Sequence, residues 1–341
     1  MMNFCTLFDS YYIHKGIALY LSLEKVTKDF HLYVMAFDRE SYDKLRSIGF
    51  NNMTVEFLDD FETPELLAVK PTRNKAEYCW TCGPSVIHHF MSKYRLLEIT
   101  YLDADIFFMS NPQILFDEIG SNSVAITEQY IDYSEGGKYC VQFMYFRNDK
   151  DGLGCLEWWR DRCIEWCFSR YEDGKMGDQK YLEQFEHLFD NVYIIQNRGL
   201  IAPWNAGLYT YSDLSVRYNG KDYPFVFFHM HGTKFWVNND NVLVQKAIDC
   251  NLTPELTKLF FSPYGELMQT VYNTYLDSNI DSTIIEDVAN WKITLSRFKS
   301  RFRNNRFARF LWYKVLRKEY VGYEDKKLFK TNSFSGVTIK R

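Results

Sequence analysis

The feature that most constrains the fold is a regular alternation of short apolar runs and longer amphipathic segments along the first hundred residues. Apolar runs at residues 3–8, 30–37 and 55–58 have the length of strands, and the segments between them, at residues 15–25 and from residue 38 onward, have helical spacing. Strands that alternate with helices form a mainly parallel sheet whose faces the helices cover. We therefore expect an α/β fold of the Rossmann-like type.

A fourth apolar run, at residues 96–102, follows a helical segment that contains Val86 and Phe90. A strand that is buried on both faces is apolar throughout, so we place this run at the centre of the sheet. Further elements are expected after it: strands at residues 123–127, 141–146, 192–196 and 225–229, and a helix at residues 156–171.

Length and composition set the remaining limits. A chain of 341 residues is long for one core, so we expect a catalytic domain at residues 1–250 and a helical extension at residues 251–341. The formal net charge of −4 argues against a nucleic-acid partner. The eight cysteines are too sparse for a disulfide framework. Without a signal peptide or a run of about 18 apolar residues, a cytoplasmic location is expected.

Two D-x-D sequences occur in different surroundings. Asp103 and Asp105 come directly after the buried run, at the carboxyl end of a strand, where open α/β sheets bind their ligands. Burying two carboxylates costs free energy unless a positive group meets them, and a divalent cation bound to a diphosphate would do so. Asp149 and Asp151 lie in a polar segment that we expect to be a solvated turn. The simpler alternative for the first pair is a capping or turn role.

Two histidines lie at and just beyond the end of the last expected strand. In a strand, His229 and His231 point to the same side. Imidazole beside two carboxylates suits Mn²⁺ better than Mg²⁺, so these histidines are candidate metal ligands.

The segment YLDADI at residues 101–106 resembles the metal-binding motif of GT-A glycosyltransferases. It is most similar to the retaining family that includes bacterial lipopolysaccharide galactosyltransferases and glycogenin. In that family the first and third residues of the motif contact the metal, which implies Asp103 and Asp105 as ligands here.

The segment HMHGTKFW at residues 229–236 resembles the family signature H-x-x-G-x-x-K-P-W. Alignment on its glycine implies that His229 is the metal ligand and that Lys234 contacts the diphosphate. Lys234 falls one position early and Phe235 stands in place of proline, so His231 remains the alternative ligand.

Two further segments resemble donor-binding segments of this family. The sequence DQKYL, which begins at residue 178, resembles the family's D-Q-x-x-L helix start, which implies that Asp178 and Gln179 reach the donor sugar near its reacting carbon. A polar pair at a helix start is also a common cap. The segment APWN resembles a segment of related bacterial transferases and implies that Trp204 and Asn205 contact the donor.

The resemblance also implies a nucleotide site near the first strand. The turn after that strand contacts the base in the family, which implies Asp9 and Tyr12. Lys75, one helix before the acidic motif, matches the region of a basic residue that holds the donor. A solvated charge is the alternative for Lys75.

Taken together, the resemblance covers about residues 3–240 and implies metal-dependent transfer of a sugar from a nucleotide-diphosphate sugar to a glycan or lipid-linked acceptor. It implies Mn²⁺ or Mg²⁺ as cofactor, retention of configuration, and a place in surface polysaccharide or lipopolysaccharide synthesis. Two alternatives share the fold: a sugar nucleotidyltransferase, which would need a glycine-rich loop after the first strand, and an inactive nucleotide-sugar-binding module. The pair Cys79 and Cys82 suggests a redox or zinc protein, but no apolar strand precedes it.

Residues 297–318 combine nine basic side chains with aromatic and aliphatic ones and contain no acidic residue. This mixture is typical of a helix at an anionic membrane surface, so we expect peripheral attachment at the inner membrane face. The alternative is a helix that packs on the catalytic domain with its basic face outward.

Overall fold

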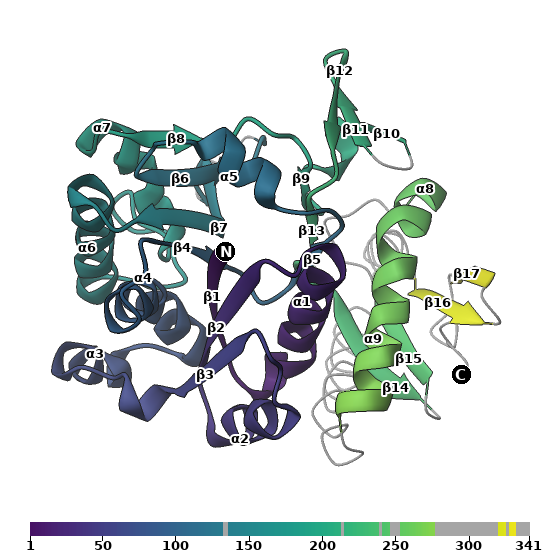
Figure 1. Cartoon of the computed structure of the whole chain (residues 1–341), viewed down its shortest axis with the longest axis horizontal. Helices are drawn as coiled ribbons and strands as arrows, with labels where there is room; N and C mark the ends of the chain where they lie inside the picture. Colours follow the sequence, from purple (N-terminus) through teal and green to yellow (C-terminus); the bar gives the residue numbers. More distant parts are fainter. Residues whose placement is uncertain are drawn as a thin grey trace, which may run out of the picture. The chain divides into compact units, whose positions relative to one another are not determined.

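A computed structural model describes residues 1–131, 136–212, 215–238, 241–245, 253–276, 320–324 and 327–331 (Figure 1). Contacts divide the chain into two units, Met1–Thr210 with Leu214–His229, and Tyr211–Asp213 with Met230–Arg341. The expected division at residue 250 stays a prediction.

The first unit is built on a seven-stranded sheet in the order β3-β2-β1-β4-β7-β6-β8. All neighbouring pairs are parallel except those made by β7, which runs antiparallel to β4 and to β6. The expected mainly parallel α/β sheet is thereby confirmed. Its strands are β1 Met2–Phe8, β2 Phe30–Ala36, β3 Met53–Phe57, β4 Glu98–Leu102, β6 Val124–Glu128, β7 Tyr139–Arg147 and β8 Val192–Ile194.

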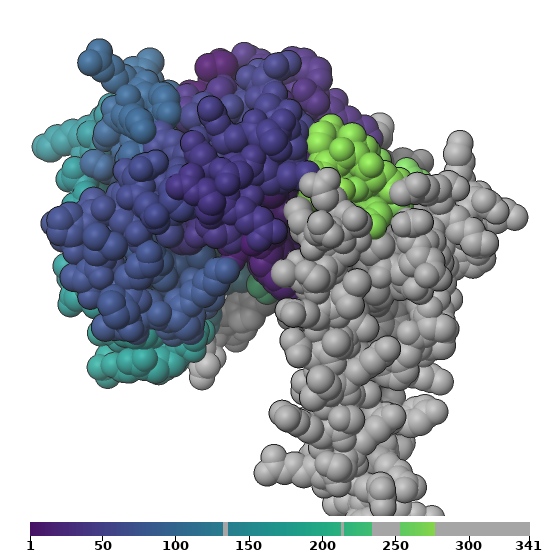
Figure 2. Space-filling model, turned by 90° about the horizontal axis from the view of Figure 1, so that it is seen from below, coloured from purple at the N-terminus to yellow at the C-terminus, as the bar shows by residue number. Residues whose placement is uncertain are grey.

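Helices cover both faces of this sheet (Figure 1). Alternation along β1 shows why: Cys5 and Leu7 enter the core formed with α4 and α6, whereas Phe4 packs on Phe108 and Phe116 on the opposite face. The α-helices of the unit are α1 Ile13–Val26, α2 Arg39–Ile48, α3 Pro64–Val69, α4 Lys75–Lys93, α5 Gln113–Ile119, α6 Lys150–Glu165 and α7 Phe185–Leu188. Short 3₁₀ turns are η1 Ser10–Tyr12, η2 Leu58–Asp60, η3 Lys70–Thr72, η4 Gln179–Gln184 and η5 Ala206–Leu208. Figure 2 shows the side of this unit where its N-terminal part, purple to blue, forms the surface.

Helix α6 begins six residues earlier than expected, and it ends before Trp166. Its N-cap is Asp149, whose Oδ1 accepts a hydrogen bond from the backbone N–H of Gly152 at 2.9 Å and whose Oδ2 accepts one from Ser123 Oγ at 2.8 Å. Asp151 accepts a hydrogen bond from Asn191 Nδ2 at 2.6 Å. The prediction of a solvated turn at Asp149 and Asp151 was therefore wrong, because these two aspartates stabilise the start of a helix.

A small three-stranded sheet, in the order β5-β13-β9, joins two distant parts of the chain. Strand β5 is Ile106–Phe108, β9 is Leu200–Ile201 and β13 is Phe227–His229. The antiparallel pairing of β5 with β13 sets His229 opposite Ile106. The chain between β9 and β13 contains a hairpin of β11 Ser215–Tyr218 and β12 Lys221–Pro224.

The second unit contains a four-stranded antiparallel sheet in the order β14-β15-β16-β17. Its strands are β14 Lys234–Asn238, β15 Asn241–Gln245, β16 Tyr320–Glu324 and β17 Lys327–Thr331. The expected C-terminal helix is confirmed as α9, Ser262–Tyr275, which α8 Pro254–Leu256 and the π-turn η6 Thr257–Phe261 precede. Strands β16 and β17 were not expected. The short strand β10, Thr210–Tyr211, lies where the two units meet in sequence.

The basic segment at residues 297–318 lies outside the described residues. Within the described part of the chain, every helix is too short or too polar to serve as a membrane-spanning segment.

Candidate functional site

The acidic motif occupies the turn between β4 and β5. After the buried Leu102 the chain leaves the large sheet, and the backbone N–H of Ile106 donates to the carbonyl of Asp103 at 3.2 Å to close the turn. The backbone N–H of Asp103 donates to the carbonyl of Gln142 on β7 at 3.3 Å. The two aspartates therefore lie at the carboxyl end of β4, where an α/β sheet binds ligands.

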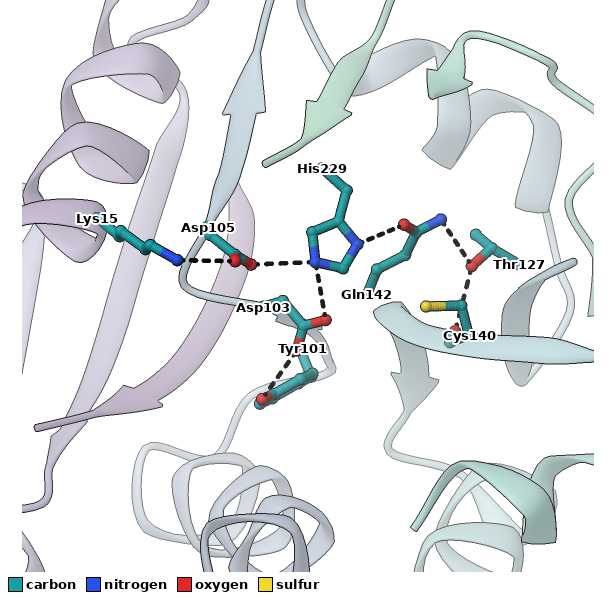
Figure 3. Close-up of polar contacts among 8 residues, drawn as sticks. All are labelled: Lys15, Tyr101, Asp103, Asp105, Thr127, Cys140, Gln142 and His229. Carbon is teal, nitrogen blue, oxygen red and sulfur yellow. Dashed lines mark hydrogen bonds and ion pairs between the residues drawn. The ribbon is translucent and has the colours of Figure 1, made fainter. Parts of the chain in front are cut away.

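His229 meets both aspartates (Figure 3). Its Nε2 lies 3.0 Å from Asp105 Oδ1 and 3.5 Å from Asp103 Oδ2. The side chains of His229 and Asp105 are 3% and 8% exposed, so their contact is shielded from water, whereas the Asp103 side chain is 23% exposed. Pairing of β5 with β13 is what brings together residues that are more than 120 positions apart in the sequence.

Gln142 fixes the orientation of the His229 ring. Its Oε1 lies 2.9 Å from His229 Nδ1, and its Nε2 donates to Thr127 Oγ1 at 3.4 Å. The hydroxyl of Thr127 donates in turn to the carbonyl of Cys140 at 3.2 Å, so its oxygen is the acceptor for the amide. Nδ1 is therefore the protonated donor, and Nε2 faces the carboxylates, as in a histidine held for metal binding.

A buried lysine completes the charge pattern. Lys15 on α1 places Nζ 3.3 Å from Asp105 Oδ2 and 4.3 Å from the ring centroid of Tyr12. The Lys15 side chain is only 7% exposed. Lys15 was not predicted, although a lysine within an otherwise apolar helix was a signal that could have identified it. Gln142 was missed too, and its place inside an apolar strand was the corresponding signal.

The pKa values show how strongly these groups depend on one another. Burial raises the pKa of Asp103 to about 6, with His229 opposing that rise and Asp105 adding to it. Burial would lower the pKa of His229, but the carboxylates of Asp105 and Asp103 outweigh it and raise the value to about 10. The imidazolium of His229 and the ammonium of Lys15 together therefore balance the charge of the two carboxylates.

This donor set fits a divalent cation. Two carboxylates and an imidazole nitrogen are ligands that Mn²⁺ accepts well, and buried carboxylates need a positive partner in any state. Asp103, Asp105 and His229 supply those three side chains from one turn and one strand. Another ligand group, Asp103, His229 and Cys140, places one atom of each residue within 4.8 Å of the others.

Asp178 lies close enough to this site for its charge to matter. It precedes η4 and is 8% exposed, and its backbone carbonyl accepts a hydrogen bond from Trp159 Nε1 at 3.0 Å. Burial, followed by the negative charge of Asp103, raises the pKa of Asp178 to about 7. Gln179 is turned to a loop, where its Nε2 donates to the carbonyl of Gly136 at 2.7 Å.

The turn after β1 connects to the same site. Asp9 caps η1 by accepting a hydrogen bond from the backbone N–H of Tyr12 at 3.2 Å, and it forms an ion pair with Lys75. Since the Tyr12 ring lies beneath the ammonium of Lys15, this turn is linked to Asp105.

Trp204 packs edge-on against the imidazole of His229, with ring centroids 5.3 Å apart at 81°. Asn205 Oδ1 accepts a hydrogen bond from the backbone N–H of Ala202 at 2.9 Å, which shapes the turn that presents Trp204. Lys234 begins β14, but its side chain lies outside the described part of the structure. A donor-binding role for these three residues stays a prediction.

The cysteine pair lies inside α4. Burial raises the pKa of Cys79 to about 12 and raises the pKa of Cys82 further above its ordinary value. Redox catalysis by a C-x-x-C pair needs a thiolate whose pKa is lowered, so this environment disfavours the redox alternative.

Comparisons with known proteins identify relatives of the chain by sequence and by fold. No protein-family model matches the chain. The uncharacterized protein YfnF of Bacillus subtilis (strain 168) is 32% identical over 244 residues, covering 67% of this chain and 80% of YfnF. The uncharacterized protein YfnD of the same organism is 30% identical over 240 residues, covering 67% and 77%.

Among solved structures, an active-site mutant of LgtC superposes with a TM-score of 0.53 at 15% identity, covering 83% of this chain and 100% of LgtC. Another LgtC structure, described as a galactosyltransferase with donor and acceptor sugar analogs, gives a TM-score of 0.47 at 13% identity, with the same coverage. The chain therefore belongs to the family of YfnF and YfnD, and its fold is the GT-A fold of glycosyltransferases such as LgtC.

Proposed function

We propose that this protein is a metal-dependent glycosyltransferase that takes a sugar from a nucleotide-diphosphate sugar and passes it to a glycan or lipid-linked acceptor. The observation that carries the proposal is the convergence of Asp103, Asp105 and His229 at the carboxyl end of β4. A GT-A fold alone does not establish activity, so the weight falls on this site.

Asp103, Asp105 and His229 would hold Mn²⁺ or Mg²⁺, which supplies positive charge to a departing diphosphate. The chain prepares this role in two ways. Gln142 keeps His229 Nε2 directed at the carboxylates, and the His229 proton must leave before that nitrogen can act as a ligand. Lys15 adds a fixed positive charge beside Asp105, on the side where Tyr12 lies.

Donor binding is proposed for the groups around this centre. Asp9 connects Tyr12 of the same turn to Lys75 at the start of α4, and this group suits a nucleotide. Lys234 is proposed for the diphosphate, and Trp204 and Asn205 for the donor as well.

Asp178 and Gln179 are proposed to face the reacting carbon of the donor sugar. Because the pKa of Asp178 is raised to about 7, this carboxyl is partly ionised near neutral pH. In its ionised form it would stabilise the positive charge that develops on the sugar ring. Retention of configuration is part of the proposal and comes from the family resemblance.

The cellular setting is also a proposal. We place the reaction in surface polysaccharide or lipopolysaccharide synthesis, with the basic segment at residues 297–318 docking the chain at the inner membrane face. The nucleotidyltransferase alternative expects a glycine-rich loop after β1, whereas Asp9 caps a 3₁₀ turn there. An inactive module would not need the intact acidic site.

A donor screen tests this proposal. Purified protein is incubated with a panel of nucleotide-diphosphate sugars and Mn²⁺, and release of nucleoside diphosphate is measured with and without chelator. We expect release from one donor or a few, and none in excess chelator. Equal release in chelator would remove the metal from the proposal, and no release from any donor, with or without acceptor extract, would favour an inactive binding module.

A further inference from the structure

A thiol borders the acidic site on β7. Cys140 is 4% exposed and precedes Gln142 by two residues, so the two side chains project from the same face of the strand. One ligand atom each from Cys140, Asp103 and His229 lies within 4.8 Å of the other two. Figure 3 shows Cys140 beside the network that holds His229. None of the roles assigned above to the manganese site uses this thiol.

The Cys140 sulfur changes which metal ion the group of Cys140, Asp103 and His229 prefers. Thiolate is a soft ligand that selects zinc over Mn²⁺ and Mg²⁺, both of which prefer oxygen. Bonds of about 2.3 Å from zinc to sulfur and about 2.0–2.2 Å to nitrogen or oxygen place tetrahedral ligand atoms roughly 3.5 Å apart. Asp103 Oδ2 and His229 Nε2 are already 3.5 Å apart, and the ligand atom of Cys140 lies within 4.8 Å of one from each of these two residues, so a modest inward movement would complete the set.

We propose that Cys140, His229 and Asp103 form a zinc site that overlaps the manganese site and that zinc bound there blocks donor binding. As zinc binds, it takes a lone pair from Sγ and one from the imidazole, and the thiol and imidazolium protons pass to solvent. Zinc binding rests on the geometry of these three residues, and inhibition rests on the proposed function.

Inhibition follows from the number of open positions. A structural zinc site is four-coordinate and closed. Asp105 Oδ1, which is 3.0 Å from His229 Nε2, is the next carboxylate oxygen along the motif and would turn toward the ion to supply the fourth ligand. A zinc ion held by these four side chains has no position left for a diphosphate oxygen.

Cobalt provides a probe that does not depend on sugar transfer. Metal-free protein is titrated with Co²⁺, and the near-ultraviolet charge-transfer band of a cobalt–thiolate bond is recorded. We expect the band to saturate at about one Co²⁺ per chain and to be lost in Cys140→Ser. The matched control is Cys79→Ser, which changes the half-buried thiol of the C-x-x-C pair on α4 and should keep the band.

Affinities sharpen the test. Zn²⁺ should displace Co²⁺, and Cys140→Ser should weaken zinc binding by at least about tenfold while Mn²⁺ affinity changes by less than about threefold, because only zinc uses sulfur. A missing thiolate band in the wild type, or a band that survives Cys140→Ser and is lost in Cys79→Ser, overturns the inference.

If Cys140→Ser does not fold, X-ray absorption of the zinc-loaded wild type decides the question. A sulfur neighbour at about 2.3 Å supports the site, and a shell of nitrogen and oxygen alone overturns it. The two proposals fail separately: Mn²⁺-dependent donor cleavage without a thiolate band sinks only the zinc site, and a thiolate band without donor cleavage sinks only the proposed function.

Discussion

The two D-x-D segments of this chain have the same spacing and opposite surroundings. Asp103 and Asp105 lie at the carboxyl end of β4, where they meet two charged side chains, the imidazole of His229 and the ammonium of Lys15. The hydroxyl of Tyr101 also donates a hydrogen bond to Asp103 Oδ1 at 3.4 Å. Asp149 and Asp151 lie at the start of α6, where their partners are a backbone N–H, a hydroxyl and an amide. Asp103 and Asp105 therefore have positively charged partners, whereas Asp149 and Asp151 accept hydrogen bonds from neutral donors.

The difference teaches that position in the fold decides what a pair of carboxylates can do. At a helix start, unpaired backbone N–H groups donate hydrogen bonds to the capping carboxylate, so its oxygens are less available to bind a cation. At the end of a buried strand few backbone donors are available, so the carboxylates need a cation. Protonated His229 and Lys15 supply positive charge to the carboxylates, and a bound metal ion would supply it in place of the His229 proton.

The largest expected effect on donor cleavage comes from replacing aspartate by asparagine at the first pair, compared with the same replacement at the second pair. The double substitution of Asp103→Asn with Asp105→Asn should lower donor cleavage by about a thousandfold or more, because several kcal/mol of charge stabilisation is lost. The matched double substitution of Asp149→Asn with Asp151→Asn should leave cleavage within about threefold of wild type. Initial rates at saturating Mn²⁺ measure both, and comparable losses in the two variants would break the comparison.

The next effect tests how far the influence of the first pair extends. Asp178→Asn should lower kcat by about a hundredfold with a much smaller change in KM, because its proposed partner carries charge only in the transition state. Steady-state kinetics with the accepted donor separates the two constants. A loss confined to KM would assign Asp178 to ground-state binding, and an unchanged kcat would remove it from the site.

The pH dependence of Mn²⁺ affinity follows from the raised pKa values of the first pair and its histidine. With the pKa of His229 at about 10, the metal displaces about one proton between pH 7 and 9, so its dissociation constant should fall about tenfold per pH unit as pH rises. Below about pH 6 the Asp103 carboxyl also becomes protonated, and the slope should steepen. Calorimetric titrations at pH 5, 6, 7, 8 and 9 measure the slope. His229→Ala should lose the slope above pH 7, and a flat wild-type profile would contradict the assignment.

The smallest effect concerns the second pair. Asp149→Ala removes the N-cap of α6 and should lower the free energy of unfolding by about 1 kcal/mol, with Mn²⁺ affinity unchanged. Chemical denaturation measures the first quantity and Mn²⁺ titration the second. The substitution Asp149→Ser, which keeps a capping oxygen, should restore most of the lost stability; a drop in Mn²⁺ affinity would show that the two regions are not independent.

Much of the fold was predictable because its signals are local. The apolar run before Asp103 identified β4, and alternating strands and helices indicated the parallel sheet. The start of α6 was missed because an aspartate before a helix and an aspartate in a solvated turn look alike without the Gly152 N–H that Asp149 accepts from. Strand β16 was missed because it pairs with β15, which is far away in sequence, and β17 was missed with it because β17 pairs only with β16 among the described strands.

The site was partly predictable for the same reason. Asp103, Asp105 and His229 belong to short motifs, and the structure brings them together through β5 and β13. Lys15, Gln142 and Cys140 belong to no motif, and only packing of α1 and β7 against the acidic turn shows their part. A polar residue within an apolar element is a local signal, but it does not identify the residues of another element that it contacts.

Manganese binding tests the central claim most directly. The electron paramagnetic resonance signal of free Mn²⁺ is titrated against wild type, the Asp103→Asn and Asp105→Asn double variant, and the Asp149→Asn and Asp151→Asn double variant. The account predicts about one bound ion per chain in the wild type and in the second variant, and none in the first at the same concentrations. Retained binding in the first variant, or equal loss in both, would contradict the claim that the acidic turn after β4 is the metal site.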